Sequence, residues 1–203
     1  MSEAASRVSV DVLALRYRPA RGTVEVATTA RSTEPFQGQL ALPGVLLLEG
    51  ERLAEAASRA VETKLGASVA ALGQLVVFDE PTRDPRGATL SAAMWAVTDG
   101  DGECEWFGLD ALPELAFDHN RIVEECRPLL ADKLWRDLTF TRALTGRAFP
   151  VSAAVAITTS LTDQAPDRGN LNRRLASLRG LNVSTRRVVA GRGRPGTLWE
   201  WQD

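Results

Sequence analysis

Apolar and polar residues alternate in two stretches near the N-terminus of this 203-residue chain, Val8–Tyr17 and Gly22–Ala30. A period of two places successive side chains on opposite faces of a strand, so both stretches are predicted strands. The segment RPARG between them contains proline and glycine, which favour a turn. A shorter strand, GQLALPG, is predicted to end at Pro43 and Gly44.

From Leu53 to Leu65 the apolar residues recur with a period of four instead of two. Leu53, Ala57, Val61 and Leu65 recur every four residues, which is typical of a helix with one apolar face. Gly66 follows directly and is expected to end the helix, because glycine readily adopts the left-handed conformation found at helix C-termini.

Strands and a further helix are predicted in the next part of the chain. Gly73–Glu80 and Ala88–Val97 have the composition of strands and are joined by the polar loop PTRDPRG, and EWFGLDAL resembles a strand running into a turn. Asp118 is the expected N-cap of a helix in which Pro128 introduces a kink. The apolar positions of that helix are Ile122, Cys126, Leu129 and Leu130.

The pattern changes near Leu134. Three short helical stretches (LWRDLTFTRALTG, VSAAVAITTSL and DRGNLNRRLASLRG) are followed by a strand, a basic glycine-rich turn and a closing strand. Three helices and a hairpin are the layout of a winged helix-turn-helix. The sequence therefore predicts an α+β protein with one domain over residues 1–135 and a winged helix over residues 136–203.

Charge divides the chain in the same way. Residues 1–135 carry 13 basic and 21 acidic side chains, a net charge of −8, whereas residues 136–203 carry 11 and 5, a net charge of +6. Such an asymmetry is typical of a nucleic-acid-binding part beside an acidic part, although a solvated basic face without a partner has the same composition.

Composition excludes several other classes of protein. No apolar run approaches the roughly 18 residues of a membrane span, and the N-terminus lacks the pattern of a signal peptide. The two cysteines, Cys104 and Cys126, lack metal-ligand spacing and fit free thiols in the cytoplasm. With His119 as the one histidine, a metal site made of several histidines is excluded.

The stretch LPGVLLLEGERLAEAASRAVETKLGA, Leu42 to Ala67, resembles the Nudix box, and the resemblance implies a Nudix-like α/β/α sandwich for residues 1–135. Glu51, Arg59, Val61 and Gly66 fall on the motif's glutamate, arginine, aliphatic residue and final glycine. Val45 replaces the first glycine of the motif. Three further positions, where the family has glutamates on the helix, are occupied by Ala60, Thr63 and Lys64.

Those replacements remove the chemistry that the family's helix supplies. Positions i, i+3 and i+4 share one helix face, and glutamates there are the hard oxygen ligands that magnesium or manganese prefers. A methyl, a hydroxyl and an ammonium group cannot replace them, and Lys64 repels a divalent cation. Glu55 and Glu62 share another face, but Arg59 lies between them. We therefore expect no catalytic residue, no metal and no other cofactor.

A ligand site is expected at the loop RDPRG. Arg83 and Arg86 flank a rigid Asp-Pro turn and suit the capture of a phosphate or carboxylate; a solvated loop tip is the alternative. This loop and the later segment LPELAFDH are similar to segments of the Nudix-related transcriptional regulators (NrtR type) and their hydrolase relatives. The resemblance implies a non-hydrolysed, ADP-ribose-like effector at Arg83, Asp84, Arg86 and Glu51. His119 directly follows the expected N-cap, so a structural capping role is expected for it rather than catalysis.

The C-terminal part carries the resemblance further, because NLNRRL resembles that family's recognition helix and GRGRPGTLWEW its wing. Asparagine and arginine pair with adenine and guanine in the major groove. Leucines 171, 175 and 178 are expected to face inward, and Trp199 and Trp201 to fill the small core. The expected DNA-binding residues are Arg168, Asn170, Asn172, Arg173, Arg174, Arg192 and Arg194.

Three functions remain open on these grounds. The first is a cytoplasmic homodimeric repressor that binds a palindromic operator in double-stranded DNA, and the resemblance implies control of NAD metabolism. The second is an ADP-ribose hydrolase with unorthodox metal ligands. The third is an adaptor that uses both domains as protein-binding surfaces.

Overall fold

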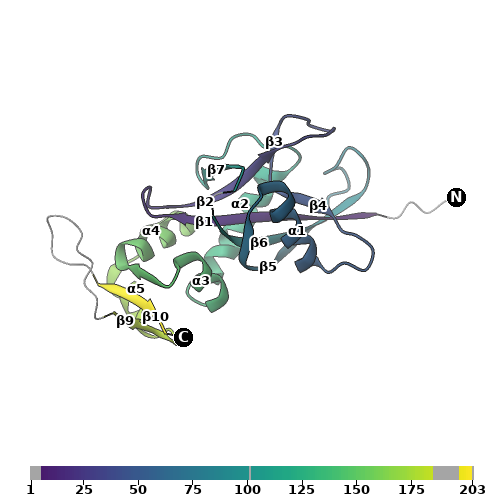
Figure 1. The fold of residues 1–203 in the computed structure, drawn as a ribbon. Coiled ribbons are helices and arrows are strands. Elements are labelled where there is room, and N and C mark those ends of the chain that lie inside the picture. The colour runs from purple at the N-terminus through teal and green to yellow at the C-terminus, as the bar shows by residue number, and fades with distance from the viewer. Residues whose placement is uncertain (1–5, 101, 185–196, 203) are drawn as a thin grey trace. The chain divides into compact units, whose positions relative to one another are not determined.

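The computed structural model describes residues 6–100, 102–184 and 197–202. The chain forms two compact units (Figure 1), Met1–Arg16 with Glu25–Cys126 and Tyr17–Val24 with Arg127–Asp203. Arg192 and Arg194, expected on the wing, lie outside the described residues. The sequence predicts a ligand-sensing domain up to residue 135 and a DNA-binding domain from residue 136. This division and the functions assigned to its two parts stay predictions.

A mixed sheet forms the centre of the first unit. Within the described residues it has seven strands in the order β3-β2-β1-β6-β5, with β4 paired to β1 and β7 paired to β2. β1 runs parallel to β6, from Arg7 opposite Thr89 to Leu15 opposite Val97. The strands are β1 (Arg7–Arg18), β2 (Thr23–Ala30), β3 (Leu40–Ala41), β4 (Gly44–Leu46), β5 (Ser68–Phe78), β6 (Thr89–Asp99) and β7 (Glu105–Gly108).

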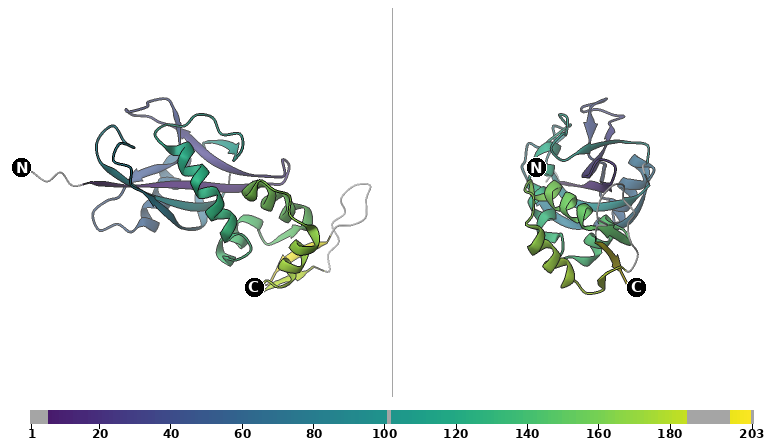
Figure 2. Two further views of the ribbon diagram at one scale, coloured as in Figure 1. Left: turned by 180° about the vertical axis from the view of Figure 1, so that it is seen from behind. Right: turned by 90° about the vertical axis from the view of Figure 1, so that its left-hand side faces the viewer.

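The helix α1 (Leu53–Leu65) has the predicted bounds and ends at Gly66, whose φ is 63°. Its buried residues, Ala56, Ala57, Ala60, Val61 and Leu65, pack against Val10, Val12 and Ala14 of the sheet. The beginning of α2 (His119–Lys133) lies on the other face of the sheet (Figure 2), so the unit has the predicted α/β/α layers.

Some local predictions differ from the structure. Strand β4 was missed because three residues are too few to show a period, and β5 begins at Ser68 rather than Gly73. Asp118 precedes α2, but its carboxylate accepts two bonds from Arg83, 2.7 and 3.0 Å long, instead of a cap bond. Leu129 was expected to be inside, yet it is 37% exposed.

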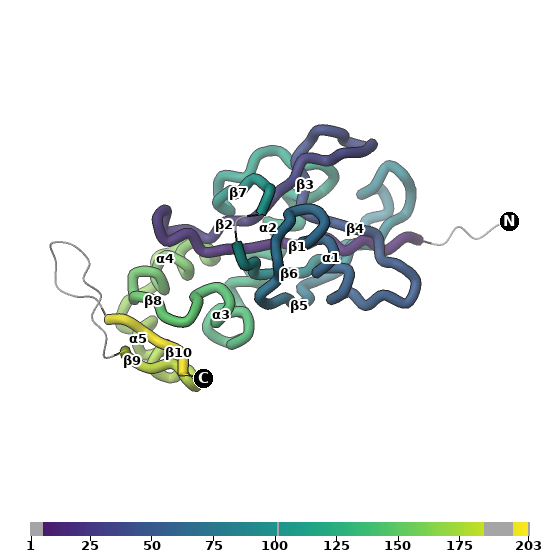
Figure 3. The backbone as a smooth tube through the Cα atoms, viewed as in Figure 1, coloured from purple at the N-terminus to yellow at the C-terminus, as the bar shows by residue number. Residues whose placement is uncertain are grey.

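Within the described residues, the second unit contains the three helices and the two strands predicted for a winged helix, in the predicted order (Figure 3). The predicted basic turn lies outside them. The three-residue strand β8 was not predicted; it joins a small sheet of order β8-β10-β9. Trp199 and Trp201 are buried in this unit, as are Leu171 and Leu175. Its elements are α3 (Leu138–Thr145), β8 (Ala148–Pro150), α4 (Val151–Thr162), α5 (Arg168–Ala176), β9 (Leu181–Val183) and β10 (Leu198–Trp201).

The turn between β1 and β2 also belongs to the second unit. The backbone N–H of Val24 donates to Ser160 Oγ of α4 over 3.1 Å. Gly22, at φ 62°, brings its Cα so near α4 that an added Cβ would lie 4.0 Å from Ala156. Among the described residues, no helix has the length and apolar character needed to cross a membrane.

The core of the second unit depends on Phe149, which is 2% exposed and stacks on Trp135 at 5.9 Å. We expect Phe149→Ala to lower the free energy of unfolding by about 3–5 kcal/mol, because it removes apolar contacts and leaves a cavity. Urea denaturation followed by tryptophan fluorescence measures the change. Val183→Ala, at a side chain that is 58% exposed, is the control and should change stability little; equal losses in both variants would contradict this account.

Candidate functional site

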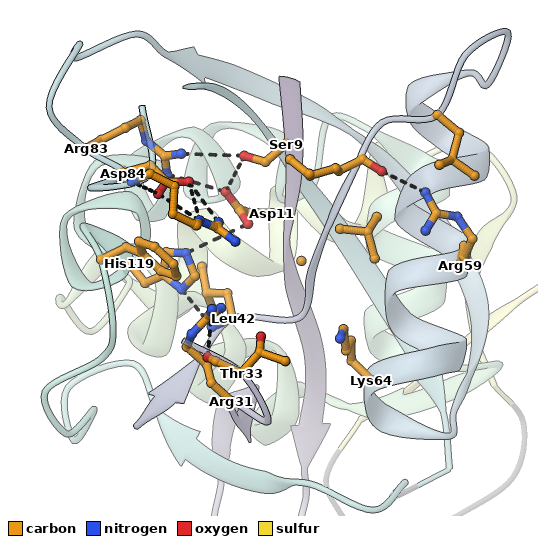
Figure 4. Close-up of a pocket in the computed structure, with 16 residues that line it drawn as sticks. Ser9, Asp11, Arg31, Thr33, Leu42, Arg59, Lys64, Arg83, Asp84 and His119 are labelled. Carbon is orange, nitrogen blue, oxygen red and sulfur yellow. Dashed lines mark hydrogen bonds and ion pairs between the residues drawn. The ribbon is translucent and has the colours of Figure 1, made fainter. Parts of the chain in front are cut away.

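A cavity of about 370 Å³ opens in the first unit between α1 and the loops beyond the sheet. Figure 4 shows Arg59 and Lys64 projecting from α1 on one side, with Arg31, Arg83 and His119 on the other. Five cationic side chains line the cavity, but only two carboxylates do. The cations are Arg31, Arg59, Lys64, Arg83 and Arg86, and the carboxylates are Asp11 and Asp84. The cavity is thus suited to an anionic ligand.

Asp11 is a polar position of β1 that lies at the cavity wall and is 5% exposed. Its Oδ2 accepts from Ser91 Oγ at 2.5 Å and from Ser9 Oγ at 3.2 Å. Gly44 lies opposite Asp11 in the β1–β4 pair. A Cβ at position 44 would lie 2.3 Å from Asp11 Oδ1, so glycine is required there.

The side chain of Arg83 is buried and fixed by ion pairs, so it is not free to move toward a ligand. Its side chain is 4% exposed. It forms a paired bond with Asp118, over 2.7 and 3.0 Å, and its Nη2 also lies 3.4 Å from Asp11 Oδ2. Arg83 lines the cavity, but its guanidinium already neutralises buried carboxylates, and its expected role in ligand binding stays a prediction.

Arg86 and Asp84 form the adjoining part of the wall. Asp84 accepts from the backbone N–H and the guanidinium of Arg86, the shortest bond being 2.8 Å. Burial alone raises the pKa of Asp84, but the bonds from Arg86 outweigh it, so the pKa lies below its ordinary value. Asp84 therefore orients Arg86, whose side chain is 40% exposed and more accessible than that of Arg83.

Arg31 and Phe117 were not identified from the sequence. The Arg31 guanidinium lies over the Phe117 ring at 4.5 Å, and its Nε donates to Pro35 O at 2.7 Å. Burial and then the nearby Arg86 lower the pKa of Arg31. Three carboxylates offset this only in part, namely those of Asp84, Asp11 and Glu34. An arginine directly after the predicted strand Gly22–Ala30 was the one available signal.

His119 is buried and structural. Its Nδ1 accepts from the backbone N–H of Leu42 at 2.9 Å, which leaves the proton of a neutral ring on Nε2, 3.8 Å from Asp11 Oδ1. Burial lowers the pKa of His119, so the ring is neutral near pH 7. The ring thereby fixes the segment that leads into the Nudix-like loop.

Glu51 and Arg59 hold that loop together. Glu51 accepts two bonds of 2.7 Å from Arg59 and one of 3.0 Å from the backbone N–H of Leu48. The Arg59 hydrogen bond and then the Leu48 N–H lower the pKa of Glu51 to about 2. Glu51 is not among the residues that line the cavity. Its predicted contact with a ligand stays untested, and its carboxylate has a structural partner.

The three positions that lost a glutamate have different surroundings. Ala60 is fully buried in the core, and Thr63 Oγ1 donates to Arg59 O at 2.6 Å. Lys64 alone of the three lines the cavity. Within residues 6–100, 102–184 and 197–202, no group of three or more His, Cys, Asp or Glu side chains is placed to hold a metal ion.

The predicted DNA-binding residues lie on the exposed side of α5. Arg168, Asn170, Asn172, Arg173 and Arg174 are exposed, whereas Leu171 and Leu175 are buried. Arg173 donates to Asn170 Oδ1. Arg174 Nη2 donates to Trp135 O at 2.9 Å and so anchors α5 to the turn after α2.

Comparison with solved structures identifies the fold. Shewanella oneidensis NrtR complexed with a 27mer DNA matches with a TM-score of 0.79 and 22% identity, over 96% of this chain and 93% of that one. A MutT/nudix family protein from Enterococcus faecalis matches with a TM-score of 0.77 and 18% identity, over 100% and 88%. The chain has the fold of the Nudix-related transcriptional regulators. The predicted fold class and resemblance are confirmed.

Two further matches cover part of the chain. The NUDIX domain of S. oneidensis NrtR complexed with ADP ribose matches with a TM-score of 0.53 and 25% identity, over 63% of this chain and 90% of that one. ADP-ribose pyrophosphatase from Methanocaldococcus jannaschii is 35% identical over 103 residues, 47% of this chain. The match spans 61% of that relative's length. No protein-family sequence model matches the chain.

The burial of Arg83 gives a prediction about stability. Arg83→Ala leaves Asp118 and Asp11 without their guanidinium, so the free energy of unfolding should fall by about 3–5 kcal/mol, as measured by chemical denaturation. Arg121→Ala, in which the lost guanidinium is 44% exposed, is the control and should leave stability nearly unchanged. A stable Arg83→Ala protein would show that Arg83 is not structural.

The state of His119 gives a prediction about pH. Since its pKa in the folded protein lies below the ordinary 6.5, the unfolded chain takes up the proton first as the pH falls. Stability from this group is present above pH 6.5 and should decline below it, by at most about 1.4 kcal/mol per pH unit. His119→Gln retains an acceptor for Leu42 and should decline less between pH 6.5 and 5. Parallel profiles of the two proteins in denaturation experiments would refute this role.

Proposed function

We propose that the chain is a DNA-binding transcriptional repressor whose Nudix-like unit senses an ADP-ribose-like metabolite without hydrolysing it. The observation that carries this proposal is the match to S. oneidensis NrtR over 96% of the chain, which includes both units. That regulator was solved with DNA, and its NUDIX domain was solved with ADP ribose. Control of NAD metabolism, implied by the resemblance, is part of the proposal.

The surface of α5 supports DNA binding. The buried leucines face the core of the unit, so the asparagines and arginines between them face solvent and can enter a major groove. Arg173 and Asn172 have no bond to another element of the described chain, whereas Arg174 is tied to Trp135. We therefore assign base contacts to Asn172 and Arg173, and a positioning role to Arg174.

A palindromic operator requires two copies of α5 about 34–36 Å apart on one face of the DNA. A twofold homodimer supplies this spacing, and we include it in the proposal. The effector must bind the DNA-free and DNA-bound states unequally, since equal affinities change nothing. This coupling is reciprocal: if the effector weakens DNA binding, bound DNA weakens effector binding by the same factor.

Arg173→Ala and Asn172→Ala should each weaken operator binding about 10- to 100-fold, because a good base contact contributes about 1–3 kcal/mol. The operator is first selected from random duplex DNA with the intact protein, and affinity is then measured by fluorescence anisotropy with and without ADP-ribose. Arg121→Ala removes the same charge from the first unit and is the matched control. Unchanged affinity in the α5 variants, or equal losses in the control, would refute the assignment.

The partial match to an ADP-ribose pyrophosphatase supports one alternative, a hydrolase with unusual metal ligands. An assay of ADP-ribose cleavage with Mg²⁺ separates the two functions. Turnover above about 0.1 per second would favour the enzyme, because typical enzymes turn over at 1 per second or faster. We expect none at that level, because Lys64 places an ammonium where the Nudix motif has a glutamate.

A further inference from the structure

Most of the positive charge around the cavity is already neutralised by the protein. Arg59 pairs with Glu51 at 2.7 Å, Arg83 with Asp118 at 2.7 Å and Arg86 with Asp84 at 2.8 Å. Arg31 and Lys64 also line the cavity. Neither forms an ion pair with any carboxylate of the described residues.

These two cations lie where two hollows meet. A second hollow of about 270 Å³ adjoins the cavity, and both are lined by Arg31, Thr33, Leu42, Gly44 and Lys64. Figure 4 shows Lys64 and Arg31 on opposite sides of this shared region, with Thr33 near them. A ligand that fills both hollows must therefore pass its central part between two positive charges. A diphosphate that bridges two organic groups has this shape and charge.

We propose that Lys64 takes the place of the divalent cation, so that Lys64 and Arg31 bind the diphosphate of the ligand without metal. Replacing a glutamate by lysine changes the local charge by two, which equals the charge of one Mg²⁺ ion. The ammonium supplies three donors to phosphate oxygens. This inference deepens the proposed function, on which it rests for the effector class.

The two cations differ in how they are held. Arg31 is fixed before a ligand arrives, because it donates to Pro35 O at 2.7 Å and Thr33 O at 3.3 Å and stacks on Phe117. Lys64 is exposed at the end of α1 and can adjust its flexible stem to the phosphate. A fixed guanidinium and a mobile ammonium together bind a diphosphate without the octahedral geometry that Mg²⁺ demands.

Calorimetric titration with ADP-ribose tests the proposal. The intact protein should bind equally well in EDTA and in Mg²⁺. Lys64→Ala should bind ADP-ribose about 10- to 100-fold more weakly, because it loses a charge-assisted contact. Lys64→Glu should lose still more affinity for ADP-ribose in EDTA. Lys133→Ala, which removes the chain's other lysine, is the control and should bind as the intact protein does. Binding that requires Mg²⁺, or full affinity in Lys64→Ala, would overturn the proposal.

A second measurement uses the fact that Lys64 and Lys133 are the two lysines of the chain. Amine acetylation read by mass spectrometry should be slowed at Lys64 by ADP-ribose in EDTA and unchanged at Lys133. Equal rates at Lys64 with and without bound ligand would count against the contact.

Inorganic pyrophosphate, used as a second probe, separates this proposal from that of the preceding subsection. Lys64-dependent binding of pyrophosphate without metal, together with no binding of ADP-ribose, would support the phosphate site and refute the proposed effector. Binding of ADP-ribose as described, without any effect on affinity for DNA, would support the site and refute the regulatory function. Failure of both probes to bind would overturn the phosphate site.

Discussion

The buried contact between Arg83 and the carboxylates of Asp118 and Asp11 is the constraint on which the first unit depends. It joins the loop before β6, the start of α2 and the middle of β1, three segments far apart in the sequence. Gly44 must lack a side chain because Asp11 occupies the adjacent space, and His119 packs beside the same carboxylate. These groups neutralise one another in the wall of the cavity, which other cationic side chains also line.

The ion pairs in the wall of the cavity also determine which cationic side chains are available to an anionic ligand. Arg59, Arg83 and Arg86 each have a carboxylate partner, so a ligand's phosphate must compete with an existing ion pair. Arg31 and Lys64 offer charge without such competition. In α5 the same reasoning distinguishes two neighbours, because Arg174 is bound to the backbone of Trp135 and Arg173 bonds only within its own helix.

The sequence was sufficient for the fold and for only part of the site. The four-residue period of α1 and the glycine after it determined both ends of that helix, because both signals are local. Strands β4 and β8, three residues each, are formed by pairing with partners distant in sequence, which leaves no period to detect. Arg83 was predicted to bind a ligand from a loop tip, but its burial depends on Asp118, 35 positions away, which the local sequence does not reveal. Arg31 and Phe117 come together only through tertiary packing.

The packing around Ala60 restricts which residues of the Nudix motif this chain can accommodate. Its methyl group is enclosed by the alanines and valines of the sheet, so an acid introduced there would meet apolar neighbours rather than solvent. Introducing the motif's glutamate at this position would first require the neighbouring side chains to shrink or to move apart. A single exchange at Lys64, in contrast, meets no such obstacle. A glutamate can therefore be accommodated at position 64 by one exchange, whereas at position 60 it requires the surrounding core to repack.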